Sequence, residues 1–447
     1  MSKHRARVVA LTMALALVAA ACSSSSKGGG STNTTAASTG SQQIDYKALG
    51  LWDNGPCDQA RPPLKIGLMT VFESPVLSLK DQADALQAAA TAFNKRGGAN
   101  GACIKVTTCD DGGNVDQAVA CARTVDKAGI VATVNDQGTA GQAEVSQAMA
   151  KAKIPRIASN VVPDDWADPN AYPLDASGTG VTFLEPQALI DSNVKKIAIV
   201  RVDLAAASAI LGLLNGLYKK TGATFPADIP VPGGTTDFSQ FILAAQNAGA
   251  NGIAIALGEQ EAIQVVRAGQ QLDTNLKIVG TLGTFSHDTA KGLGSFASKM
   301  VFIWSYPPAT FDLPVYRVLR ADLAASGNKQ LQPTTLKASA MRSWIGLYAL
   351  LKMIRDAKMQ SFTRDGITAM LHNAKNVPML GIFGGENWTP NLNHSGVFKR
   401  AGTNHWATYR WDPNAKANGF DGNFVETSTM SFDKVLCGSP FGSPGPC

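Results

Sequence analysis

Short apolar runs alternate with segments of helical periodicity along most of the chain. Residues 64–71 form a short, mostly apolar run, which is typical of a strand buried in a parallel sheet. Apolar residues then recur at helical spacing over residues 79–93. A second strand is predicted over residues 104–109, and the pair Asn114 and Gln117 resembles a capping box that opens the next helix.

The alternation falls into two runs, which predicts two α/β domains. It pauses around residues 175–180 and restarts with an apolar strand over residues 196–200. Short strands that alternate with helices are typical of parallel α/β units. A further helix is predicted over residues 338–357, and a polar segment over residues 384–418 follows it.

Several short motifs in these two runs resemble the leucine/isoleucine/valine-binding family in their order and spacing. Members of this family are periplasmic-type solute-binding proteins of ABC importers. The resemblance covers nearly everything from about Leu64 to the region of Gly381. Its motifs are Lys65-Ile-Gly-Leu-Met-Thr, Asn94-Lys-Arg-Gly-Gly98, Cys109-Asp-Asp111, Lys196-Ile-Ala-Ile-Val200 and Asp237-Phe-Ser239.

The resemblance implies an α/β fold of two doubly wound parallel-sheet lobes, which three crossover strands join and which close on a ligand between them. We place the crossovers near Thr179, Tyr306 and Ile382. Each lobe is then discontinuous in sequence. Lobe I comprises residues 61–180 and 307–382, lobe II comprises residues 181–306 and 383–436, and residues 437–447 form a C-terminal tail.

The N-terminus has the pattern of a signal peptide over residues 1–21. Basic residues precede an apolar run over residues 8–21, which is shorter than the about 20 apolar residues that span a bilayer. Ala19, Ala20 and Ala21 then lead into Cys22, so the segment resembles a lipobox in which Cys22 is diacylated, although Ala19 stands where leucine is usual. The alternative is an ordinary secretory signal that leaves Cys22 as a free thiol.

Residues 22–60 are predicted to form the anchor and a flexible linker. Residues 23–43 are mostly Ser, Gly, Thr, Ala and Asn, and such a segment buries too little surface to offset its chain entropy. Its ends should average roughly 25 Å apart. The predicted location is therefore extracytoplasmic, at the outer face of a bacterial cell membrane, with membrane contact through the lipid anchor only.

Charge and composition exclude one class of partner. The formal net charge of +6 falls to +3 once the three Lys and Arg residues of the predicted signal peptide are removed. This balance is too mild to indicate nucleic-acid binding. We expect a monomer whose partners are a small solute and the permease subunits of an ABC importer.

Six cysteines remain besides Cys22, which is consistent with disulfides in an oxidising compartment. The coarse strand and helix pattern favours the pairs Cys57–Cys103, Cys109–Cys121 and Cys437–Cys447. Zinc binding is the alternative, but the chain has no Cys-x-x-Cys motif and no histidine near the cysteines. We therefore predict no metal site and no cofactor.

Ligands of α/β lobes bind outside the carboxyl ends of the strands. After the third predicted strand, Gln137 and Thr139 precede a helix whose first N–H groups form a natural carboxylate cradle. By the resemblance, Thr139 falls where the family places a serine or threonine on the ligand carboxylate. A plain helix cap needs the same residue type, and both roles are compatible.

Other matched positions differ from those of amino-acid binders. Asn160 retains the ability to hydrogen-bond a ligand, whereas Val162 replaces a hydroxyl with methyl groups. Leu79, Ala206 and Gly258 stand where the family has aromatic side chains. These replacements predict a larger and less polar cleft.

The carboxylate that binds the ammonium group of an amino acid falls near Leu282 in this chain. Burying an ammonium without a counter-charge costs several kcal/mol. An amino-acid ligand is therefore disfavoured unless Asp203, Glu259 or Glu261 supplies a substitute charge. A misalignment of one or two residues would restore Glu259 to that role.

The sequence thus favours a solute-binding protein for a compound larger or more apolar than leucine, such as a carboxylic acid, an amide or an aromatic compound. One alternative is a branched-chain amino-acid binder with a substituted ammonium site, and another is a ligand-sensing receptor domain. An extracytoplasmic hydrolase is disfavoured, because no Gly-x-Ser-x-Gly motif occurs in the chain. We expect no enzymatic activity.

Overall fold

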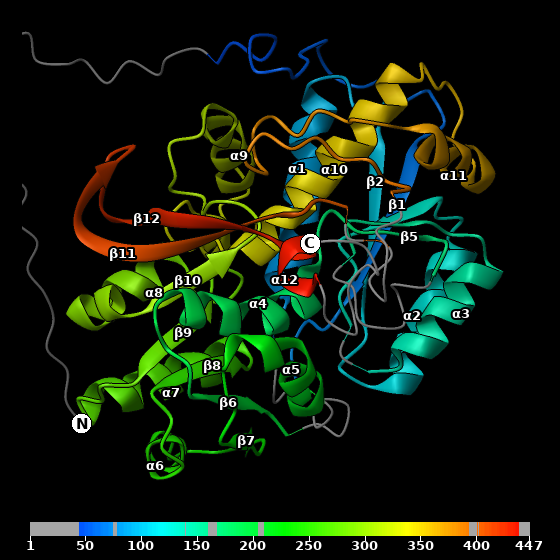
Figure 1. Ribbon diagram of the computed structural model, residues 1–447. Coiled ribbons are helices and arrows are strands. Elements are labelled where there is room, and N and C mark those ends of the chain that lie inside the picture. The colour runs from blue at the N-terminus through cyan, green and yellow to red at the C-terminus, as the bar shows by residue number, and fades with distance from the viewer. Residues whose placement is uncertain are drawn as a thin grey trace, which may run out of the picture. The chain divides into compact units, whose positions relative to one another are not determined.

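Two β-sheets organise the chain in the computed structural model (Figure 1). The structure describes residues 44–74, 78–138, 140–159, 168–203, 210–392, 400 and 402–437. The predicted signal peptide, Cys22 and the linker up to residue 43 lie outside these residues. Among the described residues, no helix combines the length and the apolar character that crossing a bilayer requires.

The first sheet is entirely parallel, with strand order β2-β1-β3-β4-β5. Its strands are β1 (Leu64–Thr70), β2 (Ile104–Asp110), β3 (Ala132–Val134), β4 (Arg156–Ile157) and β5 (Ala171–Tyr172). Helices of the same part of the chain are α1 (Lys80–Lys95), α2 (Val115–Lys127) and α3 (Gln142–Lys151). The apolar run predicted to be a buried strand is β1, whose Leu64, Ile66 and Leu68 are fully buried.

The second sheet is mixed, with strand order β12-β11-β10-β9-β8-β6-β7. Its parallel strands are β6 (Ile197–Val202), β7 (Asp228–Val231), β8 (Gly252–Ala256), β9 (Lys277–Thr281) and β10 (Val301–Trp304). Its antiparallel edge is the hairpin of β11 (His405–Ala417) and β12 (Phe420–Ser431). The helices are α4 (Ser177–Asp191), α5 (Ile210–Tyr218), α6 (Ser239–Asn247), α7 (Glu259–Gln271), α8 (His287–Gly292) and α12 (Phe432–Leu436).

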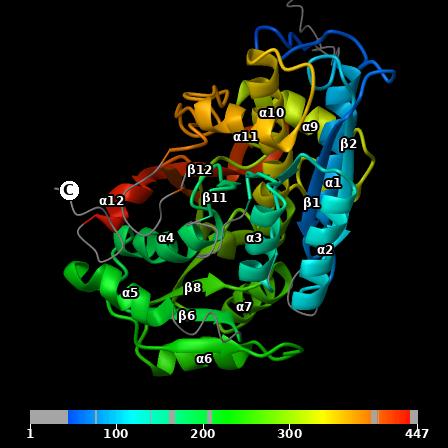
Figure 2. The same ribbon diagram turned by 90° about the vertical axis from the view of Figure 1, so that its right-hand side faces the viewer.

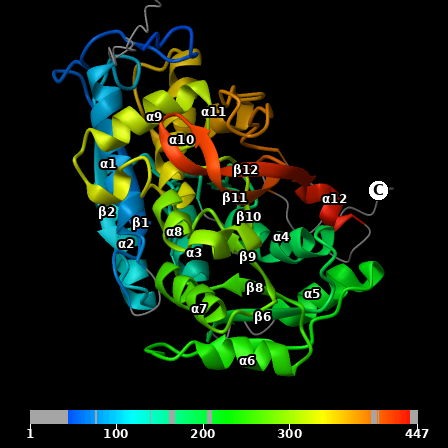
Figure 3. The ribbon, with the colours of Figure 1, turned by 90° about the vertical axis from the view of Figure 1, so that its left-hand side faces the viewer.

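The hairpin corrects the sequence-based expectation of a polar segment over residues 384–418. The first half of β11 explains the difference, because its residues 406–409 and Trp411 are buried while Arg410 is exposed. With 13 residues, β11 is longer than the 4-residue β10 on which it pairs, so its far part extends beyond the sheet (Figures 1 and 3).

Helices α9 (Pro314–Ala324), α10 (Ala338–Asp356) and α11 (Arg364–Asn373) return to the first sheet. Helix α10 lies against α1 in every view (Figures 1 to 3). Almost all of its residues are buried, as expected for a helix that is largely apolar around its whole circumference. Its Trp344 and Tyr348 stack at 5.8 Å, and Trp344 also contacts Phe93 of α1.

The chain passes between the two sheets three times, as the predicted fold requires: after β5, after β10 and before β11. Buried polar contacts tie the first two passages to α10. Nη2 of Arg342 donates to Oδ2 of Asp175 at 2.9 Å, and the hydroxyl of Ser305 donates to the same carboxylate. The hydroxyl of Tyr306 donates to the carbonyl of Ala338 at 2.7 Å.

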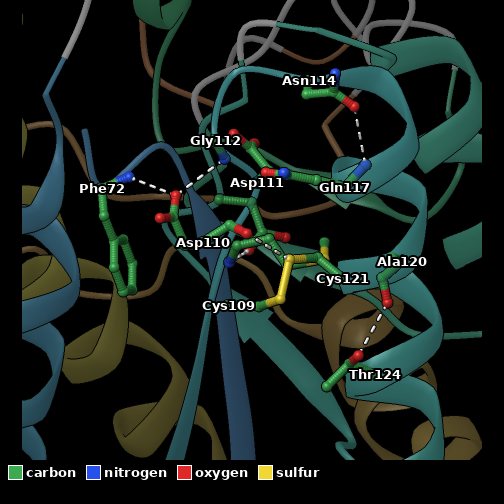
Figure 4. The surroundings of a disulfide bond; sticks show 12 residues. Phe72, Cys109, Asp110, Asp111, Gly112, Asn114, Gln117, Ala120, Cys121 and Thr124 are labelled. Atoms are coloured by element: carbon green, nitrogen blue, oxygen red, sulfur yellow. Dashed lines mark hydrogen bonds between the residues drawn. A yellow bond between two sulfur atoms is a disulfide. The ribbon is translucent and has the colours of Figure 1, made fainter. Parts of the chain in front are cut away.

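Two of the predicted disulfides are confirmed, Cys57–Cys103 and Cys109–Cys121. The second joins the end of β2 to α2, beside the Asn114 side chain, which caps α2 by accepting from the N–H groups of Asp116 and Gln117 (Figure 4). The predicted pair Cys437–Cys447 reaches outside the described residues and stays a prediction.

The predicted linker is too long at its C-terminal end. Leu51 and Trp52 are buried in the hydrophobic core, and the Trp52 ring lies 5.5 Å from that of Phe93. Cys57 is part of a disulfide. The predicted linker segment is therefore fixed to the folded body at Leu51, Trp52 and Cys57, because it carries bulky apolar side chains and a cysteine that residues 23–43 lack.

Candidate functional site

A cavity of about 180 Å³ lies at the carboxyl ends of β8 and β9. Residues 255–259, from the end of β8 to the first residue of α7, form one part of its wall, and Thr281, Gly283 and Thr284 at the end of β9 form another. The first turns of α4 and the end of β10 also line the cavity, and the start of α1, the loop after β3 and the start of α10 contribute from the first-sheet side. This is the position at which open α/β sheets bind ligands.

Five side chains make one part of the wall apolar. These are Leu79 at the start of α1, Val181 in α4, Ile255 and Leu257 around the end of β8, and Trp304 at the end of β10. Trp304 packs edge-on against Tyr306 and Trp406 and is almost fully buried, so its ring is fixed by its neighbours. An apolar solute would find a rigid surface here.

Neutral polar groups make a second part of the wall. The Oε1 atom of Gln137 accepts a hydrogen bond of 2.7 Å from Nε2 of Gln82, and Nε2 of Gln137 is a further donor of this lining residue. Ser339 donates through its hydroxyl to the carbonyl of Gly283 at 2.9 Å. Thr182 and Thr284 supply further hydroxyls.

The charged part of the wall centres on Lys337. Its Nζ atom lies 2.7 Å from Oε2 of Glu259 and 2.9 Å from Oδ2 of Asp81. The contact with Glu259 is a well-formed hydrogen bond, whereas the contact with Asp81 is an ion pair by distance without good hydrogen-bond geometry. Burial by itself would lower the pKa of Lys337, but the two carboxylates outweigh it and the pKa is raised. Lys337 is therefore charged at neutral pH.

The local sequence explains these positions. Lys337 is the N-cap residue of α10, and the N–H of the next residue, Ala338, donates to the carbonyl of Leu282 at 3.0 Å. Glu259 is the first residue of α7, where a negative charge is favourable against the helix dipole. Gly258 caps that helix without a side chain and leaves the space to the cavity.

The structure brings together Leu79, Gln137, Gly258 and Glu259 among the predicted site residues, all of which line the cavity. Thr139, Asn160, Val162 and Ala206 lie outside the described residues.

Two other predicted positions do not reach the cavity lining. Asp203 follows β6 and is exposed. Leu282 is 1% exposed and packs into the core, while its neighbours Thr281 and Gly283 line the cavity. The predicted ammonium position is thus filled from within the protein.

Sequence reasoning missed Lys337, Trp304, Val181 and Ser339. Lys337 and Ser339 lie more than 50 residues beyond the last matched motif before them, so no motif marked them. One signal was present, because Lys337 places a positive charge at the start of an apolar helix, where the helix dipole disfavours cations.

A larger recess of about 750 Å³ lies between α1 and α9, away from the strand ends. Its charged residues include Arg96 and Asp322, which pair with each other at 2.6 Å. Because it lies far from the carboxyl ends of the strands, we assign the solute site to the smaller cavity. Within the described ranges, His, Cys, Asp and Glu side chains form no group of three that would bind a metal ion.

Comparison with known proteins adds a family and a fold. The family model described as "Periplasmic binding protein" matches residues 63–415. A comparison with curated protein sequences found no match.

Solved structures of solute-binding proteins share the fold. A fatty acid ABC transporter substrate-binding protein from Thermomonospora curvata is 16% identical with a TM-score of 0.69, over 87% of this chain and 97% of that one. An ABC transporter solute-binding protein from R. palustris, in complex with 4-hydroxybenzoate, is 16% identical with a TM-score of 0.67, over 83% and 97%. A second R. palustris protein, in complex with benzoate, is 12% identical with a TM-score of 0.64, over 83% and 97%.

Proposed function

The chain belongs to the periplasmic binding protein family, the extracytoplasmic solute-binding proteins of ABC transporters, and from this premise we propose that it captures a small, largely apolar solute for an importer. The lipid anchor at Cys22 would keep it beside the permease, on a linker of roughly 25 Å mean reach. The solute would bind in the cavity at the ends of β8 and β9.

The composition of the cavity wall carries this proposal. Leu79, Val181, Ile255, Leu257 and Trp304 offer an apolar surface, and hydroxyl and amide groups with the Lys337–Glu259 ion pair form the rest of the wall. Such a mixture suits a hydrophobic body with one polar group.

The size of the cavity favours a single ring or a short chain. Its volume of about 180 Å³ is close to the roughly 150 Å³ of an engineered apolar cavity that binds benzene. It is smaller than the roughly 300–1,000 Å³ typical of pockets for drug-sized ligands. The proteins of similar fold that were solved with benzoate and 4-hydroxybenzoate support an aromatic acid as the first compound to test.

A free amino acid is the second candidate, and the ion pairs argue against it. Among the described lining residues, Glu259 is the one acidic side chain, and it is already paired with Lys337. Asp81 also pairs with Lys337. An α-ammonium group would have to break one of these pairs before it gained a counter-charge.

A thermal-shift panel tests the proposal. Benzoate, 4-hydroxybenzoate, benzamide and octanoate would be compared with leucine, isoleucine and valine on the purified mature protein. A solute at 100 times its Kd adds about 2.7 kcal/mol to stability, which shifts the melting temperature measurably. We expect saturable stabilisation by members of the first group. Stabilisation by the three amino acids and by none of the first group would overturn the proposal.

A further inference from the structure

We infer that Lys337 binds the carboxylate of an acidic solute, and that the carboxylate of Glu259 occupies this place until the solute replaces it. The inference rests on the proposed function and adds to it the charge of the solute and the residue that recognises it.

The two carboxylates beside Lys337 differ in their surroundings. Asp81 is the second residue of α1, its side chain is 5% exposed, and it does not line the cavity. Glu259 belongs to α7 on the second-sheet side, its side chain is 27% exposed, and it does line the cavity. Asp81 is therefore the fixed counter-ion of Lys337, whereas the side chain of Glu259 has space to move away from Lys337.

A buried lysine at this place needs a reason. Lys337 lines a cavity with a large apolar surface, and the residue is only 5% exposed. Its position at the start of α10 opposes the helix dipole, and burial of the ammonium group is more unfavourable still. Costs of this kind persist in natural proteins mainly at functional sites.

The exchange conserves charge in the cavity. Asp81 and Glu259 surround one ammonium with two carboxylates, so the cluster carries a net charge of −1 before the solute arrives. When the solute carboxylate takes the place of Glu259 and that side chain turns to solvent, the cavity still holds two carboxylates and one ammonium. Simple addition of a third carboxylate would instead meet strong repulsion in a medium of low dielectric constant.

Neighbouring groups also favour an anion at this point. Helices α7 and α10 both begin at the cavity, through Gly258 and Glu259 on one side and Lys337 and Ser339 on the other. Helix N-termini stabilise negative charge. Nε2 of Gln137 adds a neutral donor.

The competing interpretation reverses the roles, so that Glu259 binds an ammonium group of the solute and Lys337 only balances it. Substitutions that remove one charge at a time separate the two. We would measure the Kd of benzoate and of the neutral benzamide by calorimetry for the wild-type protein, Lys337→Gln and Glu259→Gln. Glu261→Gln is the matched control, because Glu261 lies in the same turn of α7 and is absent from the cavity lining.

Lys337→Gln should weaken benzoate binding by about 10- to 100-fold, the range expected for loss of a charge-assisted hydrogen bond. Glu259→Gln should tighten benzoate binding, because a neutral amide competes less well for the ammonium. Benzamide binding should change by less than about threefold in both variants. Glu261→Gln should leave every Kd unchanged.

Lys337→Gln leaves Asp81 buried without a counter-ion and could unfold the protein. The double variant Asp81→Asn/Lys337→Gln removes both charges. Its melting temperature should be near that of the wild-type protein, but its affinity for benzoate should be as low as that of Lys337→Gln. Unchanged or weaker benzoate binding in Glu259→Gln overturns the inference, as does wild-type affinity in the folded double variant. If the wild-type protein binds benzamide but no acid, the inference fails and the proposed function stands. If it binds only leucine, isoleucine or valine, both fail.

Discussion

Lys337 and Arg342 are two buried cations near the start of α10, and they serve different needs. Arg342 is 1% exposed and its guanidinium pairs with Asp175, which also accepts from Ser305, so it ties together two passages of the chain between the sheets. Lys337 instead reaches the cavity wall. A sequence reader sees two charges five residues apart at the start of an apolar helix, but their burial and their ion-pair partners depend on residues 78 or more positions away.

A third buried ionisable group, the carboxyl of Glu185, predicts how the stability of the protein depends on pH. Glu185 lies in α4 and is almost fully buried, and this burial raises the pKa of its carboxyl well above the usual value, although a hydrogen bond from the backbone of Ile255 opposes the shift. The folded state therefore favours the protonated acid. Its contribution to stability is complete below the unfolded-state pKa and is lost as the pH rises toward the folded-state pKa.

Glu185→Gln should consequently be more stable than the wild-type protein at pH 7, by about 1.4 kcal/mol for each unit by which the pKa is raised. The two proteins should differ little near pH 4. Urea denaturation at both pH values measures the difference. Asp191→Asn, which changes an exposed carboxylate on the same helix, is the control, and equal pH dependence of wild type and Glu185→Gln would contradict the prediction.

At the scale of elements, the apolar pattern predicted most strands and helices, because the side chains that each element buries recur at its own period in the sequence. The apolar run of β1 and the helical spacing of apolar residues in α1 are examples. The hairpin of β11 and β12 was missed because its long, partly exposed strands depend on pairing with β10. Among the predicted ligand residues that the structure describes, Leu79, Gln137, Gly258 and Glu259 line the cavity, next to strand ends or helix starts that the pattern had located.

The close approach of α10 to the first sheet predicts an effect that runs against helix propensity. A Cβ atom on Gly346 would lie 2.6 Å from Cβ of Ala158 and 3.0 Å from Cγ1 of Val134. A Gly to Ala substitution inside a helix normally raises the free energy of unfolding by up to about 1 kcal/mol. Gly346→Ala should instead destabilise the protein by about 1–3 kcal/mol, because the helix must move away from the sheet.

Chemical denaturation of Gly346→Ala measures this cost, and Gly212→Ala is the matched control. Gly212 lies in α5 with no heavy atom within 4 Å of its would-be Cβ, so this substitution should be neutral or stabilising. If both variants gained stability, α10 would not pack as closely on β3 and β4 as the structure places it.

At the scale of the whole molecule, the family and the two-sheet fold were accessible from the sequence, whereas the cavity chemistry was not. Motif order extends over hundreds of residues and survives many substitutions, so it identifies the family well. Residues at the starts of α1, α4, α7 and α10 line the cavity, and a substitution at any one of these helix starts can change which ligand binds. A resemblance to amino-acid binders therefore predicted where to look and left the solute open.

The N-terminal anchor yields a prediction that concerns the whole protein in its cell. If Cys22 is diacylated, two acyl chains give stable membrane attachment, which a single chain does not provide. The wild-type protein should then remain in the membrane fraction and release an N-terminal peptide whose mass includes the lipid. Cys22→Ser should be released to the medium or periplasm in soluble form, with unchanged solute affinity, because residues 23–43 separate the anchor from the folded body.

Ser23→Ala, which alters the adjacent residue, is the control and should stay membrane-bound. A soluble wild-type protein whose Cys22 thiol reacts with a thiol reagent would instead establish an ordinary secretory signal.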